Sequence, residues 1–570
     1  MLLEPVPRRS TFRTLTVMIA LFSAEFIAAL NTTIVATAIP TICSDLQSAS
    51  GYSWIGASYV IATTAVGPIW AKLSDIWGRK PILLLTVALY FASSIICAAS
   101  SSMGMLIVGR TLQGVSGGGL GSLINIVVSD LYSMRTRPLF LGLLQVTWAV
   151  AGGLGPVLGG AFTQLLSWRW IFWINLPVAG VAFCLLLLFL DVHDPKTKFA
   201  QGMRAIDWAG SVSIIGLMVM VLLGLNFGGT VYPWDSPKVI CLVVVGALMA
   251  IVFLFNEGRL ARHPIMPLGL FRHKSNAACL ALGFTQHFVL NMAEYYLPLY
   301  FQSAKEASPL RSGVLLLPLI VLTALTAAAA GILIHQLGRY VELIWLGMTL
   351  LTFGNGLYVW LDATSSLGSI VAFEIIAGLG TGLLFDPPLI GLQALVSQDD
   401  TATATATLGF MRGIGVSLSI VIGGVIFQNG MHLRSSTLRH HGLPADLVQQ
   451  LSGPDAATNI DLIATVSDPA QRLAVEQAFA WSLRNLWILS TCIAACGLLA
   501  SALVTKKELT KEHTETRTGI AEKTESMVIV QDGRGRDAAH ARPAVGNEHE
   551  HNHEYERDGE HNHELEHVAA

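Results

Sequence analysis

Long apolar runs recur along this chain from near its N-terminus to about residue 504. Each run has about twenty residues, the length that a helix needs to cross roughly 30 Å of hydrocarbon. Only 13% of the residues are charged, whereas soluble domains have about 25%, so the chain lacks the polar surface that a soluble protein needs. The runs do not alternate polar and apolar residues, which argues against barrel strands. We therefore predict an integral membrane protein built from helices.

Fourteen runs qualify as candidate spans. They lie near 14–40, 53–73, 82–101, 105–130, 138–163, 171–191, 208–227, 237–255, 278–302, 312–335, 341–360, 366–392, 402–429 and 484–504. We expect an N-terminal six-helix bundle at 14–191 and a C-terminal one at 278–504, with a linker at 192–277 that carries two extra helices. The predicted fold class is an all-α membrane protein with fourteen transmembrane helices.

Positive charges orient these runs. Lys and Arg gather before the first run and after the second, fourth, sixth and eighth, whereas the loops at 41–52 and 228–236 contain neither. Loops rich in Lys and Arg face the cytosol, so both termini are predicted to be cytosolic. We expect the cell (plasma) membrane as the location, with the vacuolar membrane as the alternative.

Three segments outside the runs are polar. Residues 1–13 and 505–570 are predicted to be cytosolic tails, and 430–483 a long loop on the opposite side with a helix start at Ser467-Asp468-Pro469. The C-terminal tail contains 15 acidic and 9 basic residues and should be disordered. Its two HNHE sequences, at 551–554 and 561–564, offer only loose metal ligands, so we expect no built metal site.

A second copy of one polar segment indicates internal duplication. A shift of 260 residues places GILIHQLGRY, residues 331–340, under AKLSDIWGRK, residues 71–80. Both segments follow the second helix of a predicted six-helix set, with His335 in place of Asp75 and Tyr340 in place of Lys80. Duplicated halves with a site at their interface are typical of transporters that alternate access.

Several segments resemble motifs of the major facilitator superfamily. AKLSDIWGRK resembles its motif A, with Ala71 in place of the first glycine, and GRTLQGVSGG at 109–118 resembles motif B. AGGLGPVLGG at 151–160 resembles motif C, which is typical of its antiporters. SWRWIFWINLP, DWAGS, YYLPLYFQ and FMRGIGVSL are similar to segments of fourteen-span drug:proton antiporters, especially fungal toxin-efflux pumps. The resemblance extends from the first run to the thirteenth.

The 71–80 segment allows two interpretations. Gly78 permits a tight turn, and Arg79 and Lys80 could simply anchor the chain at the anionic cytosolic leaflet. Asp75 would weaken such an anchor. The resemblance implies instead a latch, in which Asp75 and Arg79 pair with each other and with a neighbouring helix end and hold one conformation closed. His335 suggests that the second copy has lost this latch.

The fifth run is rich in glycine. Its small and helix-bending residues are Gly152, Gly155, Pro156, Gly159 and Gly160. Gly155 and Gly159 form a GxxxG pattern that allows close helix approach, and Pro156 permits a bend. Ordinary tight packing would explain this composition, but the resemblance implies a flexible seam between the halves of an antiporter.

Charged residues inside the runs need partners, because a charge at the bilayer centre costs about 2.5–3.5 kcal/mol. Arg110 and Gln113 lie on one face of the fourth run, and the resemblance implies that Arg110 acts in proton coupling with an acid of the first helix. This chain has Asn31 where the family pattern has Asp, and Asn does not titrate. Glu25, six residues earlier, is the first candidate for the proton carrier. The alternatives are Glu294 and Asp386.

The substrate cavity is expected among the first, fourth, ninth and twelfth runs. The candidate contacts are Asn31, Gln113, Asn125, Gln286, Asn291, Tyr295, Tyr296 and Phe385. Tyr295 and Tyr296 would fit an interfacial aromatic belt equally well. The small number of fixed charges favours amphiphilic or weakly polar substrates.

Together these patterns predict a proton-coupled exporter of drugs, toxins or secondary metabolites. A vacuolar or uptake transporter of basic amino acids or siderophore-type chelates, and a nutrient sensor without transport, are the alternatives. The chain contains no Gly-Lys pair and hence no P-loop for ATP, and no nucleophile–histidine pattern indicates an enzyme. We expect a monomer in the lipid bilayer that uses the proton gradient, with a small-molecule substrate, no cofactor and no nucleic-acid partner.

Overall fold

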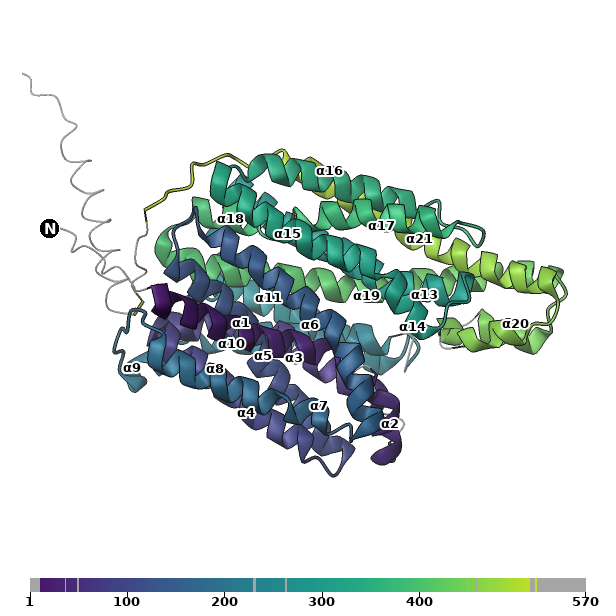
Figure 1. The fold of residues 1–570 in the computed structure, drawn as a ribbon, viewed down its shortest axis with the longest axis horizontal. Helices are drawn as coiled ribbons and strands as arrows, with labels where there is room; N and C mark the ends of the chain where they lie inside the picture. The colour runs from purple at the N-terminus through teal and green to yellow at the C-terminus, as the bar shows by residue number, and fades with distance from the viewer. Residues whose placement is uncertain are drawn as a thin grey trace, which may run out of the picture. The chain divides into compact units, whose positions relative to one another are not determined.

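The computed structural model describes residues 11–35, 37–48, 51–228, 232–261, 264–452, 454–457, 459–512 and 518–519. The chain divides into one unit at residues 1–520 and a second at 521–570. The second unit lies outside the described residues, as do most of the predicted tails and both HNHE sequences. The first unit is built from helices (Figure 1).

The helices of the first half pack on one another. They are α1 (Thr11–Thr33), α2 (Ile39–Asp45), α3 (Gly51–Trp77), α4 (Arg79–Ala98), α5 (Met103–Leu131), α6 (Arg137–Leu165), α7 (Trp170–Trp173) and α8 (Asn175–Phe189). The linker contributes α9 (Phe199–Ala205), α10 (Trp208–Phe227), α11 (Pro237–Phe255), a π-helical turn at Asn256–Leu260 and α12 (Gly269–Arg272). Of these, α10 and α11 pair with each other, and α10 also packs on α3.

The second half repeats the pattern of long helices. It contains α13 (Lys274–Ala304), α14 (Pro309–Leu315), α15 (Leu317–Leu337), α16 (Val341–Tyr358), α17 (Leu367–Gly382), α18 (Pro387–Leu395), α19 (Thr401–His440), α20 (Ala445–Leu451) and α21 (Pro469–Ser501). Short 3₁₀ turns lie at Gln398–Asp400, Pro454–Ala457 and Ile460–Thr465. In Figure 1 the green helices of this half lie beside the purple and blue helices of the first.

Eleven helical segments in the described part of the chain are long and apolar enough to cross a membrane. The predicted spans at 53–73, 278–302 and 341–360 are also helical, in α3, α13 and α16, but these three helices are not among the eleven. The structure thus agrees with an all-helical membrane protein, while the count of fourteen spans stays a prediction.

Residues 430–483 are more helical than the sequence suggests. Helix α19 continues without a break to His440, over 40 residues in all, and α21 begins at Pro469, well before the predicted span at 484. The predicted helix start is confirmed, because Asp468 Oδ1 accepts the Ala470 N–H at 2.9 Å. Part of the polar sequence at 430–483 therefore lies within α19 and α21.

Trp168 and Arg169, from the SWRW segment, hold α2 at the end of the bundle opposite the predicted cytosolic side. Asp45 Oδ2 accepts the Trp168 Nε1–H at 2.9 Å and an Arg169 N–H at 3.0 Å. These two hydrogen bonds, the Trp168 bond foremost, lower the pKa of the Asp45 carboxyl. The residues resembling the family motif thus tie the first outer loop to the loop before α7.

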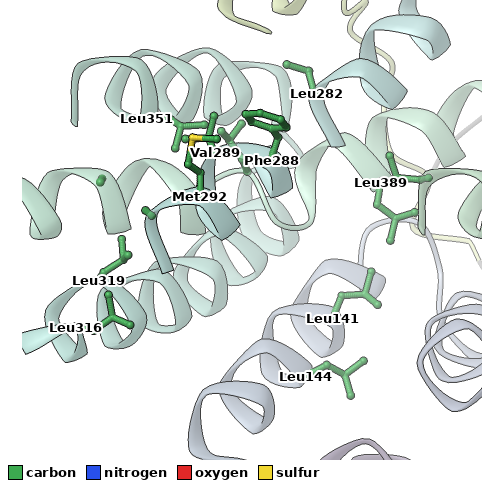
Figure 2. Packing of buried hydrophobic residues seen from close by; sticks show 14 of the residues in the cluster. Leu141, Leu144, Leu282, Phe288, Val289, Met292, Leu316, Leu319, Leu351 and Leu389 are labelled. Carbon is green, nitrogen blue, oxygen red and sulfur yellow. The ribbon is translucent and has the colours of Figure 1, made fainter. Parts of the chain in front are cut away.

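Tight packing of apolar and small residues fills each half. Figure 2 shows Phe288, Val289 and Met292 of α13 packed near Leu351 of α16, and each of these side chains is at most 1% exposed. In lipid, van der Waals contact and close approach hold helices together, because the hydrophobic effect adds little between them.

Two glycines of α6 lie against the end of α1. A Cβ at Gly155 would overlap the Thr33 side chain, and one at Gly159 would overlap the Ile34 carbonyl oxygen. By contrast, a Cβ at Gly152 or Gly160 would meet nothing within 4 Å. Pro156 lies inside the unbroken helix between these contacts. The GxxxG pair therefore joins two helices of the same half, and a role for α6 as a hinge stays a prediction.

Alanine at the packed and open glycines should behave differently. Gly155→Ala and Gly159→Ala should each destabilise the protein by about 1–3 kcal/mol, because the added methyl overlaps α1. Gly152→Ala is the matched control and should be neutral or slightly stabilising, since alanine favours helix over glycine. Thermal unfolding of the purified full-length protein measures the difference. Equal melting temperatures for Gly155→Ala and Gly152→Ala would contradict this packing.

Candidate functional site

Arg79 lies at the centre of a buried ion cluster at the predicted cytosolic end, where α3, α4 and α5 meet. Its guanidinium binds Asp75 Oδ1 at 2.7 Å and Asp130 Oδ2 at 2.8 Å. It also donates to Ser74 Oγ at 2.6 Å, and the Arg79 residue is 1% exposed. A buried charge that lost one of these partners would be strongly destabilised.

Gly78 and Lys80 flank this cluster. Gly78 has φ 94°, a backbone conformation that favours glycine, and a Cβ there would lie 2.9 Å from Pro195 Cδ. Lys80 is half-buried. The ion pairs of Arg79 with Asp75 and Asp130 join it to residues of its own half. The cluster therefore fixes the turn between α3 and α4 within the first half. Its action as a latch between conformations stays a prediction.

Arg135 connects the two halves directly. From the loop between α5 and α6, its Nε donates to the His335 carbonyl at 2.7 Å and its Nη2 to the Gln336 carbonyl. His335 Nδ1 in turn donates to the Arg135 carbonyl at 3.1 Å. A cation at the C-terminus of α15 satisfies carbonyls that have no partner within the helix. The second copy of the repeat thus takes part in a contact between the two halves. The presence of His335 in place of Asp75 did not predict this contact.

Arg137 makes a second connection two residues later. Its Nη1 donates to Gln393 Oε1 at 3.3 Å and its Nη2 to Gln398 Oε1 at 3.2 Å, both in the second half. Gln393 Nε2 returns a hydrogen bond to Ser129 Oγ of α5 at 3.0 Å. We call the set Arg135, Arg137, His335, Gln336, Gln393 and Gln398 the clasp.

Helix packing closes the same end of the molecule. A Cβ at Gly331 of α15 would overlap the Pro138 carbonyl at the start of α6, and one at Gly142 would lie 2.9 Å from the Ala327 carbonyl. The clasp therefore lies beside a tight contact between the two halves. In the sequence, Arg135 and Arg137 belong to the positive charges after the fourth run, which served only to orient the chain.

Arg110 is buried in the first half among neutral partners. Its Nη1 donates to Gln113 Oε1 at 2.7 Å and to Asn31 Oδ1 at 3.4 Å, and its Nε to the Ile55 carbonyl at 3.1 Å. The ring of Tyr59 lies 4.4 Å from the guanidinium carbon. Among the described residues no carboxylate forms an ion pair with Arg110. Asn31, at the position where the family pattern has Asp, thus contacts Arg110 through its side-chain amide.

Asn31 links this arginine to a tyrosine. Its Nδ2 donates to Tyr90 Oη at 2.6 Å, and Tyr90 Oη donates to the Ile27 carbonyl at 3.0 Å. Asn31 and Tyr90 are both 0% exposed. The amide is therefore needed on both sides, as acceptor for Arg110 and as donor to Tyr90.

Glu25 lies apart from this network. Its Oε1 accepts the Trp148 Nε1–H of α6 at 2.7 Å, whereas its buried Oε2 has no hydrogen-bond partner among the described residues. Trp148 itself is 41% exposed. A carboxyl of α1 with one unpaired buried oxygen thus lies next to a side chain of α6 that reaches the surface.

The second half contains a separate group of ionisable residues. Asp386 is 2% exposed, and its Oδ2 has no hydrogen-bond partner among the described residues. The preceding residue, Phe385, accepts a hydrogen bond from Arg412 through its carbonyl. The ring of His287 lies 5.3 Å from that of Phe385. Sequence analysis did not single out His287, which resembles an ordinary polar residue of an apolar run. Glu294, half-buried in α13, is not part of this group.

The predicted cavity residues fall in different environments. Gln113, Gln286 and Tyr296 are at most 3% exposed, and Tyr296 Oη donates to the Ile420 carbonyl at 2.5 Å. Tyr295, by contrast, is 56% exposed. The half-buried candidates are Asn125, Asn291 and Phe385. The structure brings Asn31 and Gln113 together at Arg110, and it places Gln286 with its amide 3.5 Å from the Thr381 carbonyl.

Comparison with known proteins establishes the family. The model of the Major Facilitator Superfamily matches residues 21–420. The chain belongs to the major facilitator superfamily. It is therefore a member of a family of membrane transporters and not an enzyme.

Two relatives bear on its function. The efflux pump dotC of Dothistroma septosporum is 44% identical over 504 residues, covering 88% of this chain and 86% of the relative. The efflux pump FUS6 of Gibberella fujikuroi is 35% identical over 521 residues, covering 91% and 94%. The resemblance to fungal efflux pumps is thereby confirmed.

A solved structure shows the same fold. The crystal structure of the human organic anion transporter MFSD10 (TETRAN) superposes with a TM-score of 0.55 at 16% sequence identity. The match covers 85% of this chain and all of the other. At this identity the likeness concerns the fold alone.

Removing the Asn31 amide should cost stability. Asn31→Leu leaves Arg110 and Tyr90 each without one buried partner, and the free energy of unfolding should fall by about 1–3 kcal/mol. Asn31→Asp should retain more of that stability, since a carboxylate is a stronger acceptor for Arg110. Thermal unfolding of the purified protein compares the two variants. Identical losses would mean that the contact with Arg110 contributes nothing.

Proposed function

We propose that this chain is a proton-coupled efflux pump that exports small organic molecules by alternating access. In this proposal two six-helix halves, 14–191 and 278–504, and two further spans in 192–277 make up fourteen spans. The observation that carries the proposal is the clasp, a small set of reversible polar contacts that closes one end of a two-half molecule. Export is supported by the 44% identical relative, which is named an efflux pump.

The clasp assigns an access state to the structure. It closes the end predicted to face the cytosol, so we assign the structure to a state closed toward the cytosol. Opening toward the cytosol requires Arg135 to leave the end of α15 and Arg137 to leave Gln393 and Gln398. Each contact is a hydrogen bond to a neutral acceptor, and such bonds exchange readily with bonds to water. The clasp is therefore suited to repeated opening and closing.

Proton coupling is assigned first to Glu25. A buried carboxylate with an unpaired oxygen is unfavourable, so a proton on Oε2 would remove the charge while Oε1 keeps its bond from Trp148. Trp148 lies on α6, the same helix whose start carries Arg137. A change of charge at Glu25 can thus act on the helix that leads to the clasp. Asp386 and Glu294 are the alternative proton carriers.

The substrate class follows from the charges of the interior. The buried Arg110 is already engaged by neutral acceptors, and the other candidate cavity contacts are amides and aromatic rings. Such a lining suits weakly polar or amphiphilic organic molecules, including secondary metabolites and toxins. We place the pump in the plasma membrane with both termini in the cytosol.

Weakening the clasp should favour the state open to the cytosol. Arg135→Ala removes charge-assisted hydrogen bonds, each worth about 1.5–3 kcal/mol, which corresponds to a shift of about tenfold or more in the ratio of the two states. A cysteine at Leu141, a fully buried residue beside Gly142, reports the opening through its reaction with a membrane-impermeant thiol reagent. The reagent is applied from the cytosolic side, with the exposed native cysteines replaced by serine.

Arg204→Ala is the matched control, because Arg204 is an exposed arginine of the linker. It should leave the labelling rate at Leu141→Cys unchanged. If Arg135→Ala also left the rate unchanged, the clasp would not control access.

Glu25→Gln should abolish export that depends on the pH gradient while leaving the protein folded, because Gln keeps the acceptor for Trp148 but cannot release a proton. Metabolites are profiled inside cells and in the medium, with the gene deleted, restored or replaced by the variant. The cargo should accumulate inside the deletion strain, and Glu25→Gln should fail to correct this. Asp386→Asn and Glu294→Gln, tested in parallel, identify the proton carrier if Glu25→Gln still exports. A deletion strain with no retained compound and an altered nutrient response would contradict efflux itself.

A further inference from the structure

An extended segment follows the last helix and runs along the predicted cytosolic end of both halves. We propose that residues 505–512 and 518–519, which we call the strap, dock across the two halves and hold the clasp closed. The strap would thus restrain the opening of the two halves toward the cytosol. This inference rests on the alternating access proposed above, but the docking itself can be measured without transport.

The strap is anchored first in the second half. Tyr340 Oη donates to the Thr505 carbonyl at 2.9 Å and accepts the Lys507 N–H at 3.0 Å. The Thr505 N–H donates to Ser275 Oγ at 3.0 Å. Tyr340 occupies the position that Lys80 holds in the first repeat copy. The replacement of Lys80 by Tyr340 in the second copy is thus explained by the Tyr340 hydroxyl, which binds two backbone groups of the strap.

The next contact lies in the first half. The Arg135 N–H donates to the Thr510 carbonyl at 3.2 Å. The same residue forms the clasp through its guanidinium, so strap and clasp share one loop. Leu509 is 6% exposed although its neighbours Glu508 and Thr510 are exposed. The side chain of Leu509 therefore packs against the body of the protein at the crossing between the halves.

The far part of the strap reaches the buried ion cluster. The Gly519 N–H donates to the Asp75 carbonyl at 2.9 Å, and Thr518 contacts His193 Nδ1 through both its N–H and its hydroxyl at 3.2 Å. Thr518 is 3% exposed. Asp75 is therefore in contact with the strap through its backbone and with Arg79 through its carboxylate.

The length of the strap limits how far the halves can separate while it is docked. The anchors at Thr505 and Thr510 are only five positions apart in the sequence, and five residue steps span at most about 17 Å when fully extended. The anchor at Tyr340 belongs to the second half and the anchor at Arg135 to the first. Opening of the clasp must therefore stretch this short piece or detach it. A set of weak contacts that release together forms a reversible restraint on opening.

Hydrogen–deuterium exchange of the purified full-length protein in lipid nanodiscs tests the proposal. The N–H groups of Thr505, Lys507, Thr518 and Gly519 are donors outside any helix, so peptides that contain them should exchange slowly when the strap is docked. Leu509→Asp buries a charge and should undock the strap, speeding exchange in these peptides by about tenfold or more. Peptides over 132–137 and 335–341, which contain the clasp residues Arg135, Arg137, His335 and Gln336, should exchange faster as well.

Thr510→Asp is the matched control, since it adds the same charge at the adjacent exposed residue and keeps the backbone carbonyl. It should leave exchange as in the unmodified chain. Tyr340→Phe removes only the hydroxyl that binds the strap, so it should reproduce the effect of Leu509→Asp without a new charge. Rapid exchange of the strap in the unmodified protein would refute docking. Faster exchange of the strap in both variants with unchanged clasp peptides would refute the restraint, whether or not the protein transports anything.

Discussion

The guanidinium of Arg135 at the end of α15 is the interaction on which the proposed access state of this structure depends. The last carbonyls of a helix have no partner within it, and here a cation from the other half supplies that partner. The carbonyls at the end of α15 have Arg135 as a hydrogen-bond partner only while the two halves are in contact. When they separate, water at the membrane surface can take the place of the arginine, so that only the net contribution of each bond, about 1.5–3 kcal/mol, is lost. Such a contact is strong enough to favour one state and weak enough to be broken in each cycle.

The other contacts of the molecule divide into those that persist and those that must break. Within each half, glycines bring helices to backbone contact, as Gly155 does with α1, and the ion cluster of Arg79 is buried among residues of its own half. Between the halves, the clasp and the strap add hydrogen bonds at loops and helix ends beside the close contact of α15 with α6. In the proposed alternating access, these contacts between the halves open while those within each half persist.

Much of this arrangement follows from local sequence. The length and hydropathy of the runs predict the helices, and Asp468-Pro469 predicts the start of α21. The pairing of Asp75 with Arg79 is implied by the resemblance to motif A, and the structure contains it. Contacts between distant segments do not follow, because they depend on how the helices dock. Nothing near Arg135 indicates that it meets His335, 200 residues away. Similarly, Asn31 identifies a departure from the family pattern, but only the structure shows that its amide bonds both Arg110 and Tyr90.

The central claim is that the two halves part at the clasp in response to protonation. The distance between spin labels at Thr136→Cys and Arg339→Cys, which lie on the two sides of the Arg135–His335 contact, tests this claim most directly. We expect one short distance in lipid nanodiscs at a pH where the coupling acid is ionised. A second, longer distance should become populated as the pH is lowered and the acid takes up its proton. A single short distance that pH does not change would contradict the account.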